Sequence, residues 1–341
     1  MSNIIENQAK SSKKEGFLFE DAFSKENLYL AYLQARKGKR KKLHTLDFEK
    51  SIGRNIDSLY EEIRTEKYKP RAYHQFKVFE PKERIINAPA FRDLVVQHAV
   101  YKVIYPIFDK TFIDTSFACR KGGGTHKASL YTQKELRKYS SELYFVKLDI
   151  RKFFYSIDRD ILQKLFTEKI KDQRFLRIMN AFTLMDSPKG IPIGNLLSQI
   201  YALIYLNKLD HYVKRELKVK SYVRYVDDFV LIGLTINEAK NYKKLCEKFV
   251  QEKLKLELSH WHIQKIKRGI NFVGYRTWKK KKFVRKHSMY KMKKAIKKKK
   301  INSIISLIGH AKGTNTISYY SSLLSPVIKL LPKESQKCLN I

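Results

Sequence analysis

Residues 222–232 read YVRYVDDFVLI, and this stretch decides the fold of the chain. β-Branched and aromatic residues stand on both sides of two adjacent acids, Asp227 and Asp228, and this pattern predicts a strand, a tight turn and a second strand. Two buried carboxylates this close repel each other unless a cation lies between them, and Mg²⁺ favours such hard oxygen ligands. The alternative is an ordinary hairpin with an Asp-Asp turn, which the apolar flanks disfavour.

A second acid stands in a similar context. Asp149 follows the apolar segment 144–148, which we predict to be a buried strand. An aspartate at a strand end, beside an Asp-Asp turn on a neighbouring strand, could hold two metal ions about 3.5–4 Å apart. By itself Asp149 would be read as a helix cap or a surface acid, so its assignment depends on Asp227.

Composition points to a nucleic-acid partner. The 341 residues include 71 Lys and Arg against 33 Asp and Glu, which gives a formal charge of +38. Such an excess indicates a polyanion, and the 13% of aromatic residues favours nucleic acid because bases stack on rings. A hydrophobic fraction of 43% excludes a fully disordered or collagen-like chain, and the length predicts two or three subdomains.

Cysteine spacing and hydropathy bear on the compartment. Cys119, Cys246 and Cys338 form neither a zinc motif nor a disulfide framework, which fits a reducing environment. The apolar stretch 94–108 is interrupted by polar residues, and no segment reaches the roughly 20 apolar residues that span a bilayer. Residues 1–16 lack the apolar core of a signal peptide. We therefore expect a soluble, cytoplasmic protein with no membrane partner.

Hydrophobic periodicity predicts mixed helices and strands along the chain. We expect helices over 26–36, 46–66, from 91 onward, and over 128–137, 196–217 and 238–254, the last capped by Asn237. Hairpins are expected over 71–86 and 269–278, with a glycine-rich basic loop at 120–127. Residues 279–300 contain 13 Lys or Arg and no acid. That run is either a solvated face or a nucleic-acid surface whose affinity falls steeply with salt.

Three motifs occur in order: LDIRKFF at 148–154, YVDD at 225–228 and NFVGY at 271–275. The set resembles the palm of a reverse transcriptase, with its first aspartate, its YxDD turn and its primer-grip hairpin, over about 26–278. The resemblance implies an α+β right-hand polymerase fold with fingers, an antiparallel palm sheet and a helical thumb. The implied ranges are a flexible leader at 1–20, fingers at 21–139, a palm with part of the fingers (about 160–190) at 140–275, and a basic thumb at 276–341.

The resemblance also implies a reaction. It is RNA-directed DNA synthesis by two-metal nucleotidyl transfer, with dNTP substrates, a template RNA and a cDNA/RNA hybrid as ligands. One Mg²⁺ would activate the primer 3′-hydroxyl and the other would bind the triphosphate and the leaving pyrophosphate, with Mn²⁺ as an alternative ion. The catalytic and metal-binding residues would be Asp149, Asp227 and Asp228, with Ile150 as a further metal ligand.

Binding residues are implied in the same way. The dNTP-binding set would be Lys82, Arg84, Arg92, Phe154, Ile193, Gly194 and Gln199, with Phe154 resembling the steric gate that excludes a ribose 2′-hydroxyl. The primer grip would be Phe272, Val273, Gly274 and Tyr275. Nucleic acid would contact Arg120, Lys121, Lys127, Lys279, Lys280, Lys281, Lys282, Arg285, Lys286, Lys293 and Lys294. From the residues alone, the cations would be a basic surface and Phe154 a core residue.

Residues 191–199, IPIGNLLSQ, narrow the resemblance to the reverse transcriptases of diversity-generating retroelements. Most reverse transcriptases have Gln-Gly where Ile193 and Gly194 stand. The subclass implies mutagenic retrohoming, in which a template-repeat RNA is copied with errors at adenines, and a small basic accessory variability protein as an oligomeric partner. Ile193 would forgo a polar contact worth about 0.5–1.5 kcal/mol and so loosen nucleotide discrimination, unless it is simply a core residue.

Other interpretations remain open. The main alternative is a defence-associated or group II intron-like bacterial reverse transcriptase, although only 63 residues follow Trp278. A non-enzymatic alternative is an RNA-binding scaffold with a vestigial polymerase site, against which the three aspartates argue. His260 and His262 would share one strand face, but no third ligand is near in sequence, so a metal site there is disfavoured.

Overall fold

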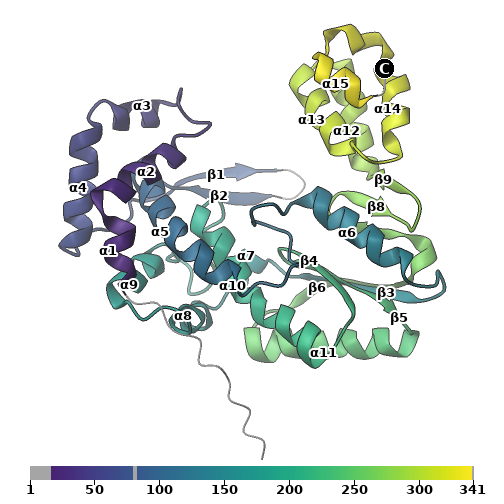
Figure 1. The fold of residues 1–341 in the computed structure, drawn as a ribbon, viewed down its shortest axis with the longest axis horizontal. Coiled ribbons are helices and arrows are strands. Elements are labelled where there is room, and N and C mark those ends of the chain that lie inside the picture. The colour runs from purple at the N-terminus through teal and green to yellow at the C-terminus, as the bar shows by residue number, and fades with distance from the viewer. Residues whose placement is uncertain (1–16, 80–82, 340–341) are drawn as a thin grey trace, which may run out of the picture. The chain divides into compact units, whose positions relative to one another are not determined.

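The computed structural model describes residues 17–79 and 83–339, and the chain divides into two compact units. Unit 1 comprises Met1–Phe112, Lys152–Lys208 and Leu254–Leu256, and unit 2 comprises Ile113–Arg151, Leu209–Lys253 and Glu257–Ile341. Each unit mixes helices with antiparallel strands (Figure 1). The predicted α+β class is therefore confirmed, whereas the subdomain boundaries remain a prediction.

Unit 1 is mainly helical. It contains α1 (Leu18–Phe23), α2 (Lys25–Ala35), α3 (Leu43–Glu49), α4 (Ile52–Arg64), α5 (Phe91–Asp109), α7 (Phe153–Ser156), α8 (Arg159–Thr167), α9 (Gln173–Ala181), most of α10 (Leu196–His211) and the hairpin of β1 (His74–Val78) and β2 (Arg84–Ala88). Helices α2 and α5 pack together, and each contributes small buried residues, such as Ala31 and Ala99, to the core. The predicted helices and hairpin of this region are present, except that residues 46–66 are divided between α3 and α4.

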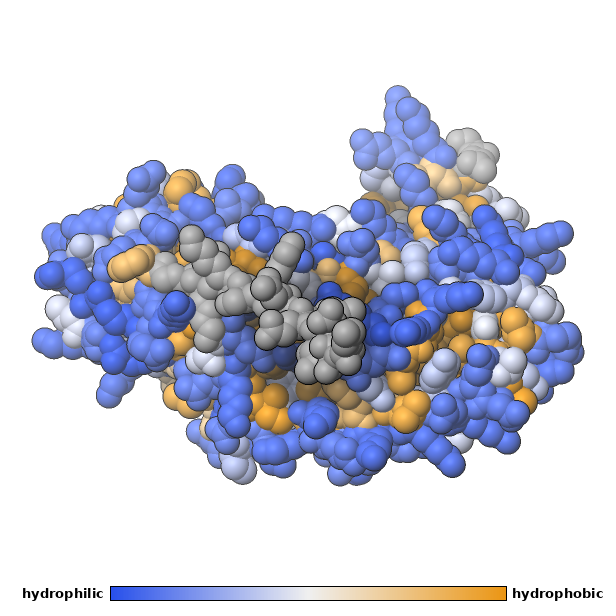
Figure 2. All heavy atoms as spheres, turned by 60° about the horizontal axis from the view of Figure 1, so that its bottom comes forward, coloured by the Kyte–Doolittle hydropathy of each residue, from blue (hydrophilic) through white to orange (hydrophobic). Residues whose placement is uncertain are grey.

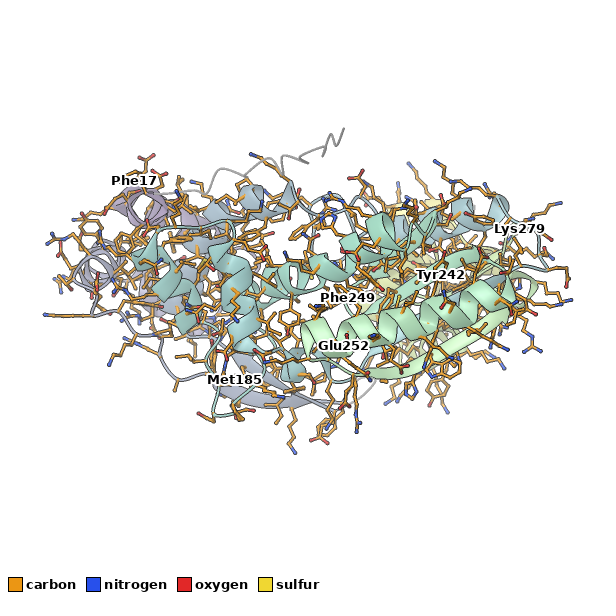
Figure 3. The ribbon with its side chains drawn as sticks, turned by 90° about the horizontal axis from the view of Figure 1, so that it is seen from below. Phe17, Met185, Tyr242, Phe249, Glu252 and Lys279 are labelled. Carbon is orange, nitrogen blue, oxygen red and sulfur yellow. The ribbon has the colours of Figure 1, made fainter. Side chains whose placement is uncertain are left out.

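Unit 2 is built on a four-stranded antiparallel sheet of order β4-β5-β3-β6. Its strands are β3 (Tyr144–Ile150), β4 (Ser221–Tyr225), β5 (Asp228–Leu234) and β6 (Leu258–Lys265). Helices α6 (Thr125–Arg137) and α11 (Ile236–Leu254) cover opposite faces of the sheet (Figure 1), and Tyr242, Phe249 and Glu252 mark the course of α11 in Figure 3. One apolar cluster joins Ala128 and Leu136 of α6 to Val223 and Val230 of the strands. This packing fixes the strand ends that carry the acids.

A smaller antiparallel sheet precedes the C-terminal helices. It consists of β7 (Ile270–Phe272), β8 (Tyr275–Thr277) and β9 (Lys282–Val284), followed by α12 (Lys286–Lys297), α13 (Ile301–Ala311), α14 (Thr316–Leu324) and α15 (Lys333–Cys338). The predicted hairpin is confirmed, and β9 is an addition that the lysine-rich composition of 279–300 concealed. Within the described residues, no helix is both long and apolar enough to cross a membrane.

The predicted helix cap at Asn237 is wrong. Helix α11 begins at Ile236, and Thr235 caps it: the Glu238 N–H donates to Thr235 Oγ1 at 3.3 Å, and the Thr235 N–H donates to Glu238 Oε2 at 2.8 Å. This reciprocal pair is a capping box, which places the cap two residues earlier than the periodicity suggested.

Gly233 allows β5 to follow the irregular register of its neighbour. Tyr144 pairs with Leu234 but Phe145 pairs with Ile232, so Gly233 is an extra residue, and its φ of 86° is in the left-handed region. A Cβ at position 233 would lie 2.3 Å from the ring of Tyr139. That ring is held by a hydrogen bond of 2.7 Å between Tyr139 Oη and Ser221 Oγ.

Gly233→Ala should therefore lower the free energy of unfolding by roughly 2–4 kcal/mol, through backbone strain and overpacking. Denaturant unfolding measures the change. The matched control is Gly309→Ala, in α13, where an added Cβ meets nothing within 4 Å and a helical alanine is favoured. Equal stabilities for the two variants would contradict the role given to Gly233.

Candidate active site

The turn between β4 and β5 carries the two adjacent acids. Tyr225 pairs with Asp228, so Val226 and Asp227 form a two-residue turn, and Asp149 on β3 is the cross-strand partner of Asp228. The Ile150 N–H donates to the carbonyl oxygen of Asp227 at 3.3 Å, which joins the end of β3 to the turn. The sheet thus places Asp149 directly opposite Asp228, with Asp227 next to it in the turn.

Val226 adopts a backbone conformation that a β-branched residue rarely takes. Its φ is 55°, in the left-handed region, which costs on the order of 1–2 kcal/mol for a side chain with a Cβ. Arg224 opposes this cost, because its Nη1 donates to the Val226 carbonyl oxygen at 2.9 Å. The side chain of Arg224 therefore stabilises the strained turn.

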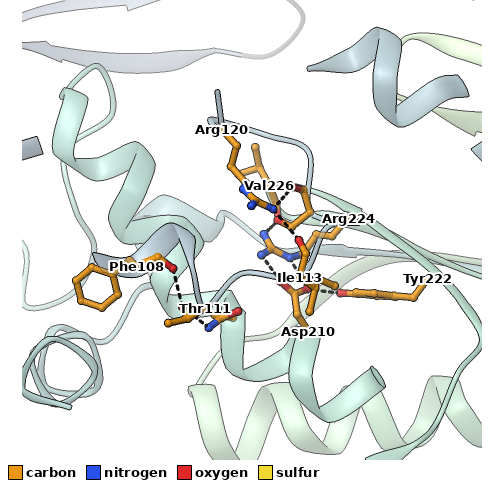
Figure 4. Close-up of polar contacts among 10 residues, drawn as sticks. Phe108, Thr111, Ile113, Arg120, Asp210, Tyr222, Arg224 and Val226 are labelled. Carbon is orange, nitrogen blue, oxygen red and sulfur yellow. Dashed lines mark hydrogen bonds and ion pairs between the residues drawn. The ribbon is translucent and has the colours of Figure 1, made fainter. Parts of the chain in front are cut away.

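Arg224 is itself fully buried and is paired with a fully buried acid, Asp210 at the end of α10. The guanidinium donates from Nε to Asp210 Oδ1 at 2.7 Å and from Nη2 to Asp210 Oδ2 at 2.5 Å, and Tyr222 Oη donates to the same carboxylate at 2.8 Å (Figure 4). The backbone of Arg224 also pairs with the segment around Ser116. Sequence reasoning missed this network, although an Arg inside an apolar strand was a visible signal for a buried ion pair.

Asp228 is half-buried beside a positive charge. Lys147 on β3 donates from Nζ to Asp228 Oδ2 at 3.0 Å, whereas Oδ1 is buried and has no hydrogen-bond donor among the described residues. Burial raises the pKa of Asp228 to about 7; Lys147 opposes this shift, and the charges of Asp149 and Asp227 add to it. Lys147 was not among the predicted site residues.

Asp149 has a different partner. Ser259 of β6 donates from Oγ to Asp149 Oδ2 at 2.7 Å. The side chain of Ile150 is buried and has no ligand atom, so a role in metal binding would fall to its carbonyl oxygen. Ser259 thus orients the first aspartate from a strand that lies next to β3 in the sheet.

The aspartates can be tested as a cation site from their own geometry. Across residues 17–79 and 83–339, no three His, Cys or acidic side chains are close enough together to hold a metal ion. Paired carboxylates on neighbouring strands, a buried carboxylate oxygen without a donor and a raised pKa nevertheless fit a hard divalent cation, which would keep Asp228 ionised. His260 and His262 are exposed on β6 and belong to no such group.

Several predicted dNTP-binding residues meet in unit 1. The Asn87 N–H of β2 donates to the Ile193 carbonyl oxygen at 2.6 Å, and the Ile191 N–H donates to the Phe154 carbonyl oxygen at 2.8 Å. Three segments, β2, α7 and 190–194, are therefore joined by their backbones. Gly194 permits this approach, since a Cβ there would lie 2.7 Å from Ile86 Cγ2.

The other members of that set are placed differently. Arg84 is exposed at the start of β2, Gln199 is exposed on α10, and Lys82 lies outside the described residues. Arg92 is 15% exposed and forms a two-point ion pair with Glu62, at 3.1 and 2.5 Å. Its guanidinium thus already serves the packing of α4 against α5.

A family model described as reverse transcriptase (RNA-dependent DNA polymerase) matches residues 74–277, well over half of the chain. The chain belongs to this family. The match spans the β1–β2 hairpin, all three aspartates and the β7–β8 hairpin, and the α+β structure with its antiparallel sheet is the right-hand polymerase fold expected from the sequence. The expected enzyme class, an RNA-directed DNA polymerase, is thereby confirmed at the level of the family.

Individual relatives are more distant. The reverse transcriptase is 24% identical to Protein YkfC of Escherichia coli strain K12 over 263 residues, covering 63% of this chain and 68% of that protein. It is 25% identical to the group II intron-encoded protein LtrA of Lactococcus lactis subsp. cremoris over 300 residues, covering 67% of this chain but 49% of LtrA. The structure of telomerase from Candida albicans aligns with a TM-score of 0.48 at 14% identity, over 80% of this chain and 55% of that one.

The predicted primer-grip segment is partly core. Phe272 and Tyr275 are fully buried, which leaves the turn at Val273 and Gly274 as the more accessible part. Tyr275 Oη lies 3.1 Å from His310 Nδ1 and 3.3 Å from His126 Nδ1, so this tyrosine joins β8 to α13 and α6. Its ring stacks on His310 with centroids 4.6 Å apart.

Hydrophilic side chains cover most of the face shown in Figure 2, but two of the predicted nucleic-acid contacts serve the fold. Lys282 is 3% exposed, and its Nζ lies 5.4 Å from the centroid of the Tyr275 ring, so the prediction that it contacts phosphate from the surface is wrong. Its side chain faces the core because side chains alternate between the two faces of β9, and Lys282 stands at a buried position. Arg120 donates from Nη1 to the Ile113 and Ser116 carbonyl oxygens at 2.7 and 3.2 Å.

The glycine-rich loop also has a structural explanation. A Cβ at Gly123 would lie 2.2 Å from the Phe117 carbonyl oxygen, so close backbone packing requires glycine there. Among the remaining predicted contacts, Lys279 is half-buried. The others are exposed: Lys121, Lys127, Lys280, Lys281, Arg285, Lys286, Lys293 and Lys294.

The role of the buried ion pair can be separated from fold stability. Asp210→Ala should lower the free energy of unfolding by about 3–5 kcal/mol, because it leaves Arg224 charged and buried without its partner. The triple variant Asp210→Leu, Tyr222→Phe, Arg224→Met removes the network together and should stay within about 2 kcal/mol of the wild type. It should still lose DNA synthesis, because the Val226 carbonyl oxygen loses its donor. Denaturant unfolding and primer extension measure both effects, and full synthesis by the triple variant would contradict the positioning role.

Proposed function

We propose that this reverse transcriptase is an active RNA-directed DNA polymerase whose reaction centre is formed by Asp149, Asp227 and Asp228. The observation that carries the proposal is the pairing of Asp149 with Asp228 across β3 and β5, beside a turn held by a buried arginine. A scaffold with a vestigial site would have no need to hold acids together in this way. The substrates are a primed RNA template and dNTPs.

In the proposed reaction, the primer 3′-hydroxyl gives up its proton to solvent as its oxygen bonds to the α-phosphorus of the dNTP. The bond between the α-phosphorus and the oxygen that bridges it to the β-phosphate breaks, and pyrophosphate leaves with that electron pair. Bound divalent cations, Mg²⁺ with Mn²⁺ as an alternative, supply Lewis-acid stabilisation of the attacking and leaving oxygens. Ser259 orients Asp149, and Arg224 fixes the turn that presents Asp227 and Asp228. Lys147 limits the repulsion between the acids until phosphate and cation arrive.

The proposed nucleotide-binding residues that follow all lie in unit 1. Phe154 is half-buried on α7, and its backbone is bonded to Ile191, which gives the proposed steric gate a fixed position. Tyr155 Oη lies 3.3 Å from the Ile85 nitrogen, so the same helix is joined to β2, where Arg84 begins the strand. Arg84 would pair with the triphosphate.

Asp227→Asn and Asp228→Asn should each reduce primer extension by about 100-fold or more, because each removes a carboxylate charge that would hold the divalent cations at the reacting phosphate. Affinity for the primed template should stay within about twofold, measured by fluorescence anisotropy. Asp47→Asn is the matched control, since Asp47 is exposed and pairs only locally with Lys50 among the described residues. A loss of template affinity equal to the loss of synthesis would instead support an RNA-binding scaffold.

The subclass that the sequence favours is the diversity-generating retroelement enzyme, acting with a template-repeat RNA and a small basic accessory variability protein. Its support is the segment 191–199, where Ile193 stands with a half-buried side chain and a backbone bonded to β2. The similarity to the group II intron-encoded protein LtrA favours a group II intron-like enzyme as the second candidate. The two candidates differ in the fidelity they predict.

Primer extension on a defined RNA template, followed by sequencing of the cDNA, distinguishes them. The retroelement assignment predicts errors concentrated opposite template adenines, and Ile193→Gln should reduce total errors by a few-fold to about tenfold by restoring a polar contact. Ile193→Leu is the matched control and should leave the error rate unchanged. Faithful or evenly erroneous cDNA would favour the intron-like or defence-associated alternative.

A further inference from the structure

A cavity of about 510 Å³ lies in unit 2, beside the turn that joins β8 to β9. Its lining residues are Ser141, which precedes β3; Ile266 and Lys267 on the 3₁₀ turn after β6; and Trp278–Lys281 with Phe283. The lining combines two aromatic rings with several lysines and contains no acid. None of the aspartates lines it.

The rings of Trp278 and Phe283 form an edge-to-face pair. Their centroids are 6.0 Å apart and their planes are at 85°. Trp278 Nε1 donates to the Lys267 carbonyl oxygen at 3.2 Å, and the indole lies so close to Gly269 that a Cβ there would be 2.5 Å from it. Phe283 remains 37% exposed. A ring fixed before binding loses little side-chain entropy when a ligand stacks on it.

The turn itself is anchored to α6. Gln133 Nε2 donates to the Trp278 carbonyl oxygen at 3.2 Å, and Arg137 Nε donates to the Lys279 carbonyl oxygen at 3.0 Å. Lys279, labelled in Figure 3, donates from Nζ to the Tyr139 carbonyl oxygen at 2.8 Å. Lys280 and Lys281 are left exposed at the tip. The lysines of this turn thus divide into one that holds the structure and two that face solvent.

The charge around the cavity selects an anionic ligand. The nearest acid in sequence to Ser141, Glu142, is neutralised by Lys265 and Lys267, at 2.7 and 3.0 Å. Arg276 and Arg268 are also exposed on the adjoining segments. Aromatic faces with cations on one side match a nucleobase with its flanking phosphates, whereas a duplex keeps its bases stacked and offers phosphates alone.

We propose that this cavity binds an unpaired nucleotide of single-stranded RNA, with its base against Phe283 and Trp278 and its phosphates at Lys280 and Lys281. The proposal rests on the proposed function in one respect, since that function makes RNA the polynucleotide that the chain handles. It adds a single-strand site that is separate from the reaction centre. A structured template RNA with an unpaired segment is the class of ligand it fits.

The test measures binding without dNTPs or divalent cations, using the full chain. The probes are a fluorescently labelled 12-nucleotide unstructured RNA, a DNA of the same sequence, and a 12-base-pair RNA/DNA hybrid. Phe283→Ala should weaken binding of the single-stranded RNA about fivefold or more, as expected for the loss of one stacked base, and leave the hybrid unchanged. Tyr319→Ala is the matched control, because Tyr319 is 45% exposed on α14 and does not line the cavity.

A second variant keeps the test independent of aromatic packing. Lys280→Gln with Lys281→Gln should lower the slope of log affinity against log salt by about 1.4, the value for two phosphates on a single strand. Lys240→Gln with Lys244→Gln, on the exposed face of α11, removes the same charge and should not. Thermal unfolding confirms that each variant is folded.

The outcomes are separable from the fate of the proposed function. Unchanged RNA affinity in both cavity variants, equal weakening of the hybrid, or a larger effect on the DNA than on the RNA would overturn the single-strand RNA site, even if the wild type extends primers. Selective weakening of the RNA would support it, even if the wild type proved inactive in primer extension.

Discussion

The buried ion pair between Arg224 and Asp210 is the interaction on which the candidate active site depends. A guanidinium with no exposed surface requires a carboxylate partner, and Asp210 supplies both of its oxygens from the end of α10. Once fixed, Arg224 has one nitrogen to spare for the carbonyl oxygen of Val226, in the left-handed turn residue next to Asp227. The buried ion pair between Arg224 and Asp210 therefore sets the position of Asp227 and Asp228.

The electrostatic environment of the three aspartates differs from that of the rest of the chain. The chain carries a formal charge of +38, yet three aspartates gather at the ends of β3 and β5. Lys147 supplies the counter-charge that the protein itself can offer, and burial still raises the pKa of Asp228 to about 7. A divalent cation bound beside this carboxyl would keep it ionised.

The excess of positive charge is not one uniform coat. Arg92, Arg120 and Lys282 are used inside the fold, in an ion pair, in bonds to carbonyl oxygens and beneath an aromatic ring. Exposed lysines such as Lys280 and Lys281 are free of such structural contacts among the described residues and can meet phosphate. The number of Lys and Arg residues in a segment therefore overestimates how many of them can bind nucleic acid. The alternation of a strand such as β9 decides which of them face solvent.

By itself, the sequence determined several of the helices, the two predicted hairpins, the turn with its two acids, and the family, because each is encoded in contiguous residues and their periodicity. The capping box at Thr235 and Glu238 was also legible locally, although Asn237 hid it. Only the tertiary structure decided the rest: that Ser259 meets Asp149 across 110 residues, that Asp210 meets Arg224, and that Lys282 turns inward. Burial and pairing of charged groups depend on which distant segments pack together, and residue spacing along the chain does not contain that information.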